Sequence, residues 1–491
     1  MLLKLLSLIP CPETWLLWRA IPYGGCRPSS GTRSAPSWNP CEAASFRLVC
    51  RTFNDIGVRF VLRDLTIYLG SDDFDRLRAI AGDPAKSKCI RSLVYSPGAF
   101  YPVGQPDIKA VNLVLRCSRL LTLAKLQAHD TYRTACRNQA RILSHDLDYE
   151  LLAAVLPQLS GLRKFLIDCE VERPEHRTRK GSNLMRWAWC QSTQHPHTQH
   201  GKPGRRALAS LLRALDTSGT ALPTLKALGL DWASVEDLSW ATTRPRLTSF
   251  FVSLRHLNLQ FCLCGILRPP HGPPYQHSDP HADAYRYTQL LASPSSGGGA
   301  LARFLAALPD LCALAISFCY GLRANTAPTS HVVLPSLEHV IRQGREQQPP
   351  RCWPRLASLS LGGLNLEKEL LMGFLESHKT KLRRMELFSV WLDADCPETL
   401  REMRRVLALE EAAVWTRIYS DRGQWHLGRP RVDATNADGK GEGYVSGEHG
   451  VNLATAVARY LVHGGECPVT ESDMVPGGAS LVEGCYTRSL Y

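Results

Sequence analysis

The strongest constraint on the fold is a nine-residue pattern that the chain contains twice. Residues 254–262 (LRHLNLQFC) and 311–319 (LCALAISFC) both fit L-x-x-L-x-L-x-x-C. The L-x-L portion predicts a short strand whose leucines face one way and whose middle residue faces the other, with the first leucine packed beneath it. One such unit is too small to fold alone, so the pattern predicts units that stack on one another.

Four looser copies extend the pattern to six units. They begin at Leu162, Leu225, Leu356 and Leu382. The shortest separations between starting positions, 26 and 29 residues, match the leucine-rich-repeat period of about 20 to 29 residues. The larger separations predict inserted loops or decayed units, and the 57 residues between the two full copies are close to twice 29. The candidate insertions are residues 172–206, 268–299 and 342–354.

Amphipathic helical segments precede most of the copies. They cover residues 149–161, 206–219, 299–310 and 366–380, where apolar residues recur three and four positions apart. Each unit is expected to contain a helix, a turn and a strand. This order predicts an α/β fold, in the form of a leucine-rich-repeat-like solenoid of helix–strand units. The alternative is a globular domain with a parallel sheet, because the same alternation occurs there.

Residues between the leucines are predicted to project from the other side of each strand, toward a bound partner. In a curved array of stacked units these positions determine which partner is recognised. The partner would be a protein whose identity the sequence does not reveal. The predicted positions are Arg255, His256, Asn258 and Gln260 in one copy, and Ser358 and Ser360 in another.

A second amphipathic segment lies near residue 50, ahead of the repeats. In residues 44–60 the apolar positions fall on one helical face, and arginine and aspartate residues lie four apart on the other. Periodicity alone favours a core helix of the neighbouring domain. Gly57 is expected to weaken or end this helix.

Residues 44–57 (ASFRLVCRTFNDIG) resemble the second half of an F-box, which usually ends in a Leu-Arg-x-Val-Cys-[Arg/Lys]-x-Phe-like helix. Residues 58–95 and 458–468 resemble a group of fungal F-box proteins with divergent leucine-rich repeats. The resemblance implies a non-catalytic substrate receptor that binds the Skp1-like adaptor of a cullin-RING (SCF) ubiquitin ligase. The adaptor-binding residues implied are Phe46, Leu48, Val49, Cys50 and Phe53.

The first half of an F-box has no matching copy in residues 1–41. That half usually opens with Leu-Pro-x-Glu-[Ile/Leu] followed by an apolar helix. Either residues 22–41 contain a degenerate copy or the start of the protein lies elsewhere. The alternative function is a leucine-rich-repeat scaffold with no ubiquitin ligase link, in which residues 44–60 are only a capping helix.

The chain is therefore divided into four regions. Residues 1–41 are predicted to be a flexible leader, 42–70 a partial F-box-like segment, 74–420 the leucine-rich-repeat-like domain, and 421–491 a mostly disordered tail with one short helix near 451–462. Residues 1–9 are too short an apolar run for an ordinary signal peptide, and no other run is long enough to span a membrane. A cytoplasmic or nuclear location is expected.

No catalytic motif with supporting context is present. The phosphate-binding G-x-x-x-x-G-K-[ST], zinc-binding H-E-x-x-H and nucleophile-bearing G-x-S-x-G patterns are all missing from the sequence. We therefore predict no enzyme activity, no cofactor and no metal, with an enzyme of unfamiliar site as a further alternative. The net charge of +13 on 491 residues is mild, so binding to nucleic acid is not expected.

For the remaining residue clusters we favour structural explanations over functional ones. Two histidine groups could bind a transition metal, but they lie in Pro-broken loops without a rigid element (His195, His197, His200; His271, His277, His281). The basic run 173–180 could contact phosphates or direct nuclear import, although an exposed loop is preferred. Many cysteines lie in apolar runs and are expected to be small buried residues (Cys50, Cys117, Cys169, Cys262, Cys312, Cys319). Packing is also favoured for the Cys262–Cys264 pair, and a reducing compartment fits this cysteine usage.

Overall fold

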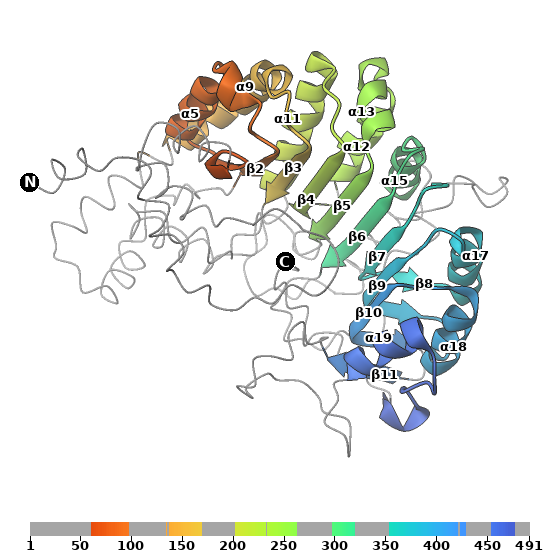
Figure 1. Cartoon of the computed structure of the whole chain (residues 1–491). Coiled ribbons are helices and arrows are strands. Elements are labelled where there is room, and N and C mark those ends of the chain that lie inside the picture. The colour runs from red at the N-terminus through yellow and green to blue at the C-terminus, as the bar shows by residue number, and fades with distance from the viewer. Residues whose placement is uncertain are drawn as a thin grey trace, which may run out of the picture.

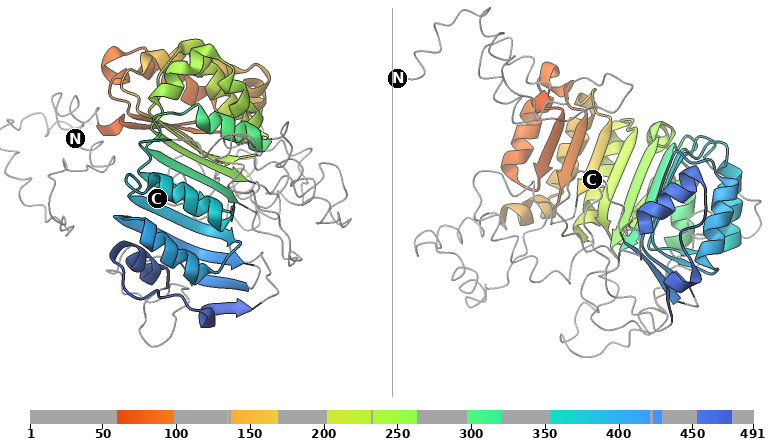
Figure 2. Two further views of the ribbon diagram at one scale, coloured as in Figure 1. Left: turned by 90° about the vertical axis from the view of Figure 1, so that its right-hand side faces the viewer. Right: turned by 60° about the horizontal axis from the view of Figure 1, so that its bottom comes forward.

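The computed structural model describes residues 60–97, 134, 137–168, 202–231, 233–262, 297–319, 353–420, 423–428 and 453–476. Within these residues twelve strands form one open, mostly parallel sheet. The strands follow one another across the sheet in chain order, except that the short β8 pairs with β9 beside the main path. Figures 1 and 2 show the sheet bending so that the helices lie on its outer, convex side.

The first part of the sheet alternates parallel strands with helices. The elements are β1 (Asp64–Tyr68), α5 (Ser71–Ala81), α6 (Pro84–Ser87), β2 (Ser92–Ser96), α9 (Leu147–Val155), η3 (Leu156–Gln158), β3 (Lys164–Asp168), α11 (Lys202–Ser218), β4 (Thr224–Leu230), α12 (Ser234–Thr242), η5 (Pro245–Leu247) and α13 (Thr248–Ser253).

The second part continues this order and then ends in antiparallel strands. The elements are β5 (His256–Cys262), α15 (Gly297–Ala306), β6 (Ala313–Cys319), β7 (Ser358–Gly362), β8 (Asn365–Leu366), α17 (Lys368–His378), β9 (Arg384–Leu392), α18 (Cys396–Val406), β10 (Glu411–Ser420), β11 (Gly423–Gly428), α19 (Leu453–His463), η6 (Glu471–Asp473) and β12 (Met474–Pro476). β11 pairs antiparallel with β10, and β12 antiparallel with β11.

All six leucine-patterned segments form strands, as predicted, and they are β3, β4, β5, β6, β7 and β9. The four predicted helical segments are confirmed as α9, α11, α15 and α17. The possibility of a decayed unit between the two full copies is wrong. β5 pairs directly with β6, from His256 opposite Ala313 to Cys262 opposite Cys319, so no further strand of the sheet lies between these two.

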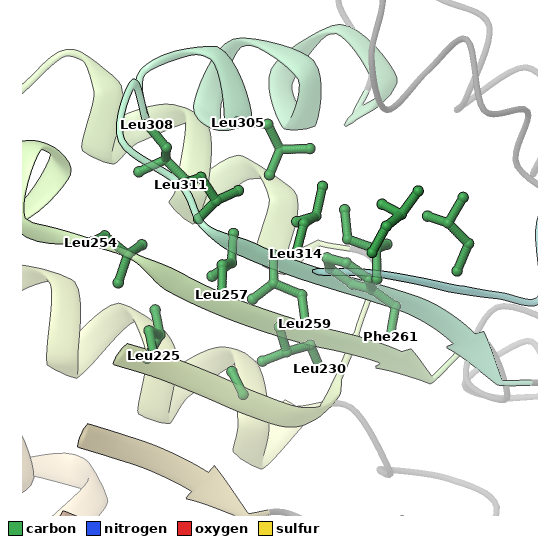
Figure 3. Packing of buried hydrophobic residues seen from close by; sticks show 14 of the residues in the cluster. Leu225, Leu230, Leu254, Leu257, Leu259, Phe261, Leu305, Leu308, Leu311 and Leu314 are labelled. Carbon is green, nitrogen blue, oxygen red and sulfur yellow. The ribbon is translucent and has the colours of Figure 1, made fainter. Parts of the chain in front are cut away.

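The inward leucines of successive strands form one continuous hydrophobic core. Leu257 and Leu259 of β5 lie opposite Leu314 and Ile316 of β6, and all four are buried. Figure 3 shows Leu257, Leu259 and Leu314 packed beneath α15 and the turn that follows it. In five of the six copies the first leucine is buried below its strand, as the pattern predicts (Leu162, Leu254, Leu311, Leu356, Leu382). The predicted alignment of the sixth copy was wrong, because Leu225 lies within β4 opposite Leu257 and the buried Leu222 takes the first position. Every strand therefore depends on its neighbours for burial.

An arginine at the second position of the pattern joins consecutive units. The carbonyl of Arg255 accepts from the N–H groups of Cys312 and Ala313 at 2.7 and 3.0 Å, and its guanidinium contacts the Asp310 carboxylate at 2.6 Å and donates to the Asp310 carbonyl at 3.2 Å. Arg91 and Arg383 make the equivalent side-chain bonds to the turn carbonyls of Gly161 and Ala408. The prediction that Arg255 faces a partner is therefore wrong, because it precedes the strand and ties two turns together.

The C-terminal region departs from its predicted disorder. Residues 423–428 and 474–476 are strands of the sheet, and α19 continues the helical layer beside α18. Trp425, Leu427 and Val457 belong to the common core. The alternating residues of QWHL and the helical spacing of 453–463 supply the apolar face that the Gly-rich surroundings concealed. At the other end, β1 at 64–68 places the start of the sheet before the predicted boundary at 74.

Left-handed residues interrupt several strands at the same level of the sheet. Gly363, Ser389 and Thr416 all have positive φ, and they follow the register partners Gly362, Phe388 and Trp415 of β7, β9 and β10. Each extra residue bends its strand while the apolar side chains after it still point inward. A Cβ on Gly363 would also collide with the carbonyl oxygen of Phe318.

We predict that Arg255→Gln lowers the free energy of unfolding by about 1 kcal/mol, because it removes a charged link between two turns. Urea denaturation measures this change. The matched control is Arg246→Gln, an exposed arginine on a neighbouring turn, for which we expect a change within about 0.5 kcal/mol. Equal stability of the two variants would refute the linking role of Arg255.

We predict that Gly363→Ala lowers the free energy of unfolding by about 2 kcal/mol or more, since both its φ of 62° and the Phe318 carbonyl oppose a side chain. Gly373→Ala is the control, because this glycine lies inside α17 with open space around it. That variant should raise stability by about 0.5–1 kcal/mol through helix propensity. Thermal denaturation of both proteins gives the comparison, and a tolerated alanine at 363 contradicts the conformation described.

Candidate protein-binding face

The sheet face opposite the helices, here called the strand face, presents the residues between the inward leucines. On β5, His256 is exposed, and Asn258 and Gln260 are partly exposed between buried neighbours. On β7, Ser358 and Ser360 alternate in the same way with buried leucines. These five residues lie on the face that was predicted for them.

Small side chains occupy the middle of the strand face. β6 contributes Ala315 and Ser317, and β7 contributes Ser360 and Gly362 in register with them. The larger side chains of β5 lie on one side of this strip, and those of β9 lie on the other. On the first strands the outward residues Leu166 and Leu228 are buried without belonging to the core. Partly exposed outward side chains occur both on the early strands, as at Thr66 and Lys226, and from β5 to β9.

Four aromatic rings and one carboxylate form a cluster on β9 and β10, which we call the aromatic–carboxylate cluster. Phe388 stacks on Trp415 with ring centroids 4.9 Å apart, and Trp391 stacks on Tyr419 at 6.2 Å. The interplanar angles are 18° and 12°, so each pair is close to parallel. Glu386 precedes Phe388 by two residues on the same side of β9. Stacked pairs of this kind stabilise a surface beyond simple burial.

Two donors hold the Glu386 carboxylate in place. Ser360 Oγ donates to Oε2 at 2.6 Å, and Trp415 Nε1 donates to Oε1 at 2.9 Å. The Phe388 ring lies over Gly362, where a Cβ would overlap its ring carbons. Contacts from β7 and β10 therefore hold the cluster in place, and the Phe388 ring extends over the strip of small residues.

The paired bulges of β9 and β10 position the second pair of rings. The hydroxyl of Thr416 accepts from the backbone N–H of Ser389 at 2.8 Å and lies 2.9 Å from its side-chain oxygen. This hydrogen bond joins the two residues of positive φ, one on each strand. Trp391 and Tyr419, which follow the bulges, are consequently aligned on the same side as Phe388 and Trp415.

Several ionisable side chains lie beside the cluster. Arg384 pairs with Glu411 at 3.3 Å on the row next to Glu386. On β11, burial lowers the pKa of His426, and the nearby Arg417 lowers that pKa further. Because the ordinary pKa of histidine is about 6.5, this imidazole is predominantly neutral at pH 7.

The larger groups of ionisable side chains lie instead between helices. Arg206 joins α11 to Asp148 of α9, Arg205 joins α11 to Asp237 of α12, and Lys368 joins α17 to Glu398 of α18. Burial raises the pKa of Asp237, whereas the positive charge of Arg205 opposes this increase. Each of these groups connects consecutive helices, so their arrangement is explained by the helical layer.

Cysteine and histidine predictions have different outcomes. Cys312 is only half-buried, because it occupies the second pattern position at a turn and its thiol contacts the carbonyl of Asp310 at 3.4 Å. The prediction that it is buried was wrong. The side chains of Cys50, Cys117, Cys169, Cys262, Cys264 and Cys319 and the two histidine groups lie outside the described residues. Across the ranges given above, no three His, Cys, Asp or Glu side chains are grouped for metal binding.

The predicted adaptor-binding residues also lie outside the residues that the structure describes (Phe46, Leu48, Val49, Cys50, Phe53). Conversely, the aromatic–carboxylate cluster was missed by sequence reasoning. The available signal was the alternation in RMELFSVWL (384–392) and EAAVWTRIY (411–419), where aromatic residues recur on the side opposite the apolar core. Their pairing required the register of β9 and β10.

Neither protein-family models nor curated proteins gave a match to this chain. The described helices include none with the length and apolar character needed to cross a bilayer. Functional inference consequently depends on the chain's own residues and on the face they form.

We predict that Trp415→Phe lowers the free energy of unfolding by about 1–2 kcal/mol, because the buried ring keeps its stacking but the Glu386 carboxylate loses a donor. Trp391→Phe is the matched control, since it also retains a ring in a stacked pair. We expect its effect to be within about 0.5 kcal/mol. Chemical denaturation compares the two variants, and equal losses would argue against the indole–carboxylate bond.

Proposed function

We propose that this chain is a non-catalytic receptor that binds a target protein on its strand face. In this proposal the helix–strand array is a leucine-rich-repeat-like solenoid, and residues 42–70 resemble the F-box that docks a Skp1-like adaptor of an SCF ubiquitin ligase. The other subunits of the ligase would perform the chemistry. The receptor would act in the cytoplasm or the nucleus.

The solenoid assignment is supported by the order and repetition of the strands. Nine parallel strands, β1 to β7, β9 and β10, follow one another across the sheet in chain order. A turn made of an apolar residue, an arginine, a polar residue and a second apolar residue recurs with equivalent bonds at Arg91, Arg255 and Arg383. A globular parallel domain commonly covers both faces of its sheet with helices, whereas the helices among the described residues lie on the convex side (Figure 2).

The observation that carries the binding proposal is the composition of the strand face. From β5 to β9 this face combines hydrogen-bonding side chains on β5 with small residues on β6 and β7 and aromatic residues on β9. Tyrosine and tryptophan are enriched at the centres of protein interfaces, while small neighbours allow close approach. The face thus provides both polar specificity and apolar contact area.

The adaptor part of the proposal rests on the resemblance of residues 44–57 to an F-box helix. These residues precede β1 in the sequence. Burial of Phe46, Val49 and Phe53 against an adaptor could contribute about 1.5–3 kcal/mol for each side chain. The unmatched first half of the F-box favours the alternative, a scaffold that binds proteins without a ligase.

We predict that the tagged full-length chain captures a purified Skp1-like adaptor and that Val49→Asp with Phe53→Asp reduces capture at least about tenfold. Two buried charges without partners would oppose docking by more than 1.4 kcal/mol, the equivalent of a tenfold change. Co-purification followed by quantitative immunoblotting measures the captured adaptor. Val252→Asp is the control, because Val252 is 49% exposed on α13, and it should capture as the unmodified protein does.

The result separates the two candidate functions. Capture that is unchanged by the double substitution would remove the proposed interface, and no capture by the unmodified chain would favour the scaffold. Circular dichroism of each variant provides the check that the sheet is folded. The strand face can bind a target protein under either outcome.

A further inference from the structure

Glu386 combines a fixed position with a charge that has no cationic partner among the described residues. Its two oxygens each accept one hydrogen bond, from Ser360 Oγ and Trp415 Nε1. A carboxylate offers about four acceptor positions, so each oxygen retains a further one. The nearest arginine along its own strand, Arg384, is paired with Glu411. The partly exposed carboxylate is therefore oriented and available for additional donors.

The rings around Glu386 are suited to a cation. The faces of phenylalanine, tyrosine and tryptophan carry partial negative charge, which attracts guanidinium and ammonium groups. Phe388 and Trp391 are both partly exposed and lie at successive outward positions of β9, each backed by the stacked ring of β10. The aromatic–carboxylate cluster thus presents ring faces beside a fixed negative charge.

The chemistry favours arginine over lysine. The planar guanidinium can donate two parallel hydrogen bonds to one carboxylate and stack on an aromatic ring at the same time. An ammonium group is a compact, strongly hydrated charge that satisfies these two contacts less well. Ser317, Ser360 and Gly362, in the neighbouring strip, have short side chains or none. An extended segment carrying the arginine can therefore approach the cluster across this strip.

We propose that the aromatic–carboxylate cluster binds an arginine side chain of the target protein. This inference rests on the proposed function, because it assumes that the strand face is the target-binding surface. The guanidinium stacks on Phe388 or Trp391 and donates to the free acceptor positions of Glu386. The cluster is then the point at which the receptor selects a basic residue in its target.

The experiment uses the full chain labelled with 5-fluorotryptophan and the peptide Ac-Gly-Ser-Arg-Ser-Gly-amide. The matched peptide carries citrulline, which has nearly the same shape as arginine but no charge. Trp391→Phe and Trp415→Phe assign the two fluorine signals. We expect the arginine peptide to shift both signals and to bind about tenfold more tightly than the citrulline peptide.

Two protein variants test the residues. Glu386→Gln keeps an oxygen acceptor but removes the charge, and it should weaken binding of the arginine peptide about tenfold. Glu376→Gln is the control, and its affinity should stay within about twofold because Glu376 lies on α17, in the helical layer on the other side of the sheet. If Glu386→Gln does not fold, as judged by its fluorine spectrum, Phe388→Leu provides the second test with the same expected direction.

Equal binding of the arginine and citrulline peptides, absence of any shift in the two assigned signals, or full affinity of Glu386→Gln would each overturn the inference. The peptide titration and the adaptor capture are independent measurements. A negative titration together with adaptor capture removes the arginine site and leaves the receptor function standing. Loss of adaptor capture together with arginine-selective binding removes the ligase link and retains the site.

Discussion

The burial of inward side chains between neighbouring strands is the constraint on which the rest of this structure depends. No strand could bury its two or three apolar residues alone, and each completes its burial by lying beside the next, as Leu257 and Leu259 do beside Leu314 and Ile316. The helices that the structure describes lie on this inward side. Because the period of a strand is two, burying one set of side chains displays the other set, and the strand face follows directly from the core.

The arginines at the second pattern position add a connection that does not depend on hydrophobic burial. Arg91, Arg255 and Arg383 each donate to a turn carbonyl of the following unit. Charged pairs then connect consecutive helices on the convex side, as Arg205 and Asp237 do. The hydrophobic core, the turns and the helical layer therefore all stabilise the same order of units. On the strand face, Arg384 of β9 pairs with Glu411 of β10.

Much of this architecture was predictable because leucine spacing directly reports burial. The six patterned strands and the helices before four of them follow from that spacing. β10 was missed because Ala412 and Ala413 replace the expected large residues around Val414, and β1 was missed because LTI lies next to an F-box-like segment. Arg255 and Cys312 were misassigned because the second pattern position is a turn. The aromatic–carboxylate cluster depends on register and bulges between strands, which local spacing does not encode.

The direct contact of β5 with β6 tests the continuous core most sharply, because 57 residues of sequence separate equivalent positions. Asn258 and Ala315 lie opposite one another on the strand face, while Ser360 lies one strand further along. Adjacent strands are about 4.8 Å apart, within the range that a disulfide spans, whereas two strand spacings exceed it. Oxidation of Asn258→Cys with Ala315→Cys, followed by mass spectrometry of the linked peptides, should give the cross-link. The pair Asn258→Cys with Ser360→Cys should not, and preferential linking of that second pair would contradict the stacked order of the strands.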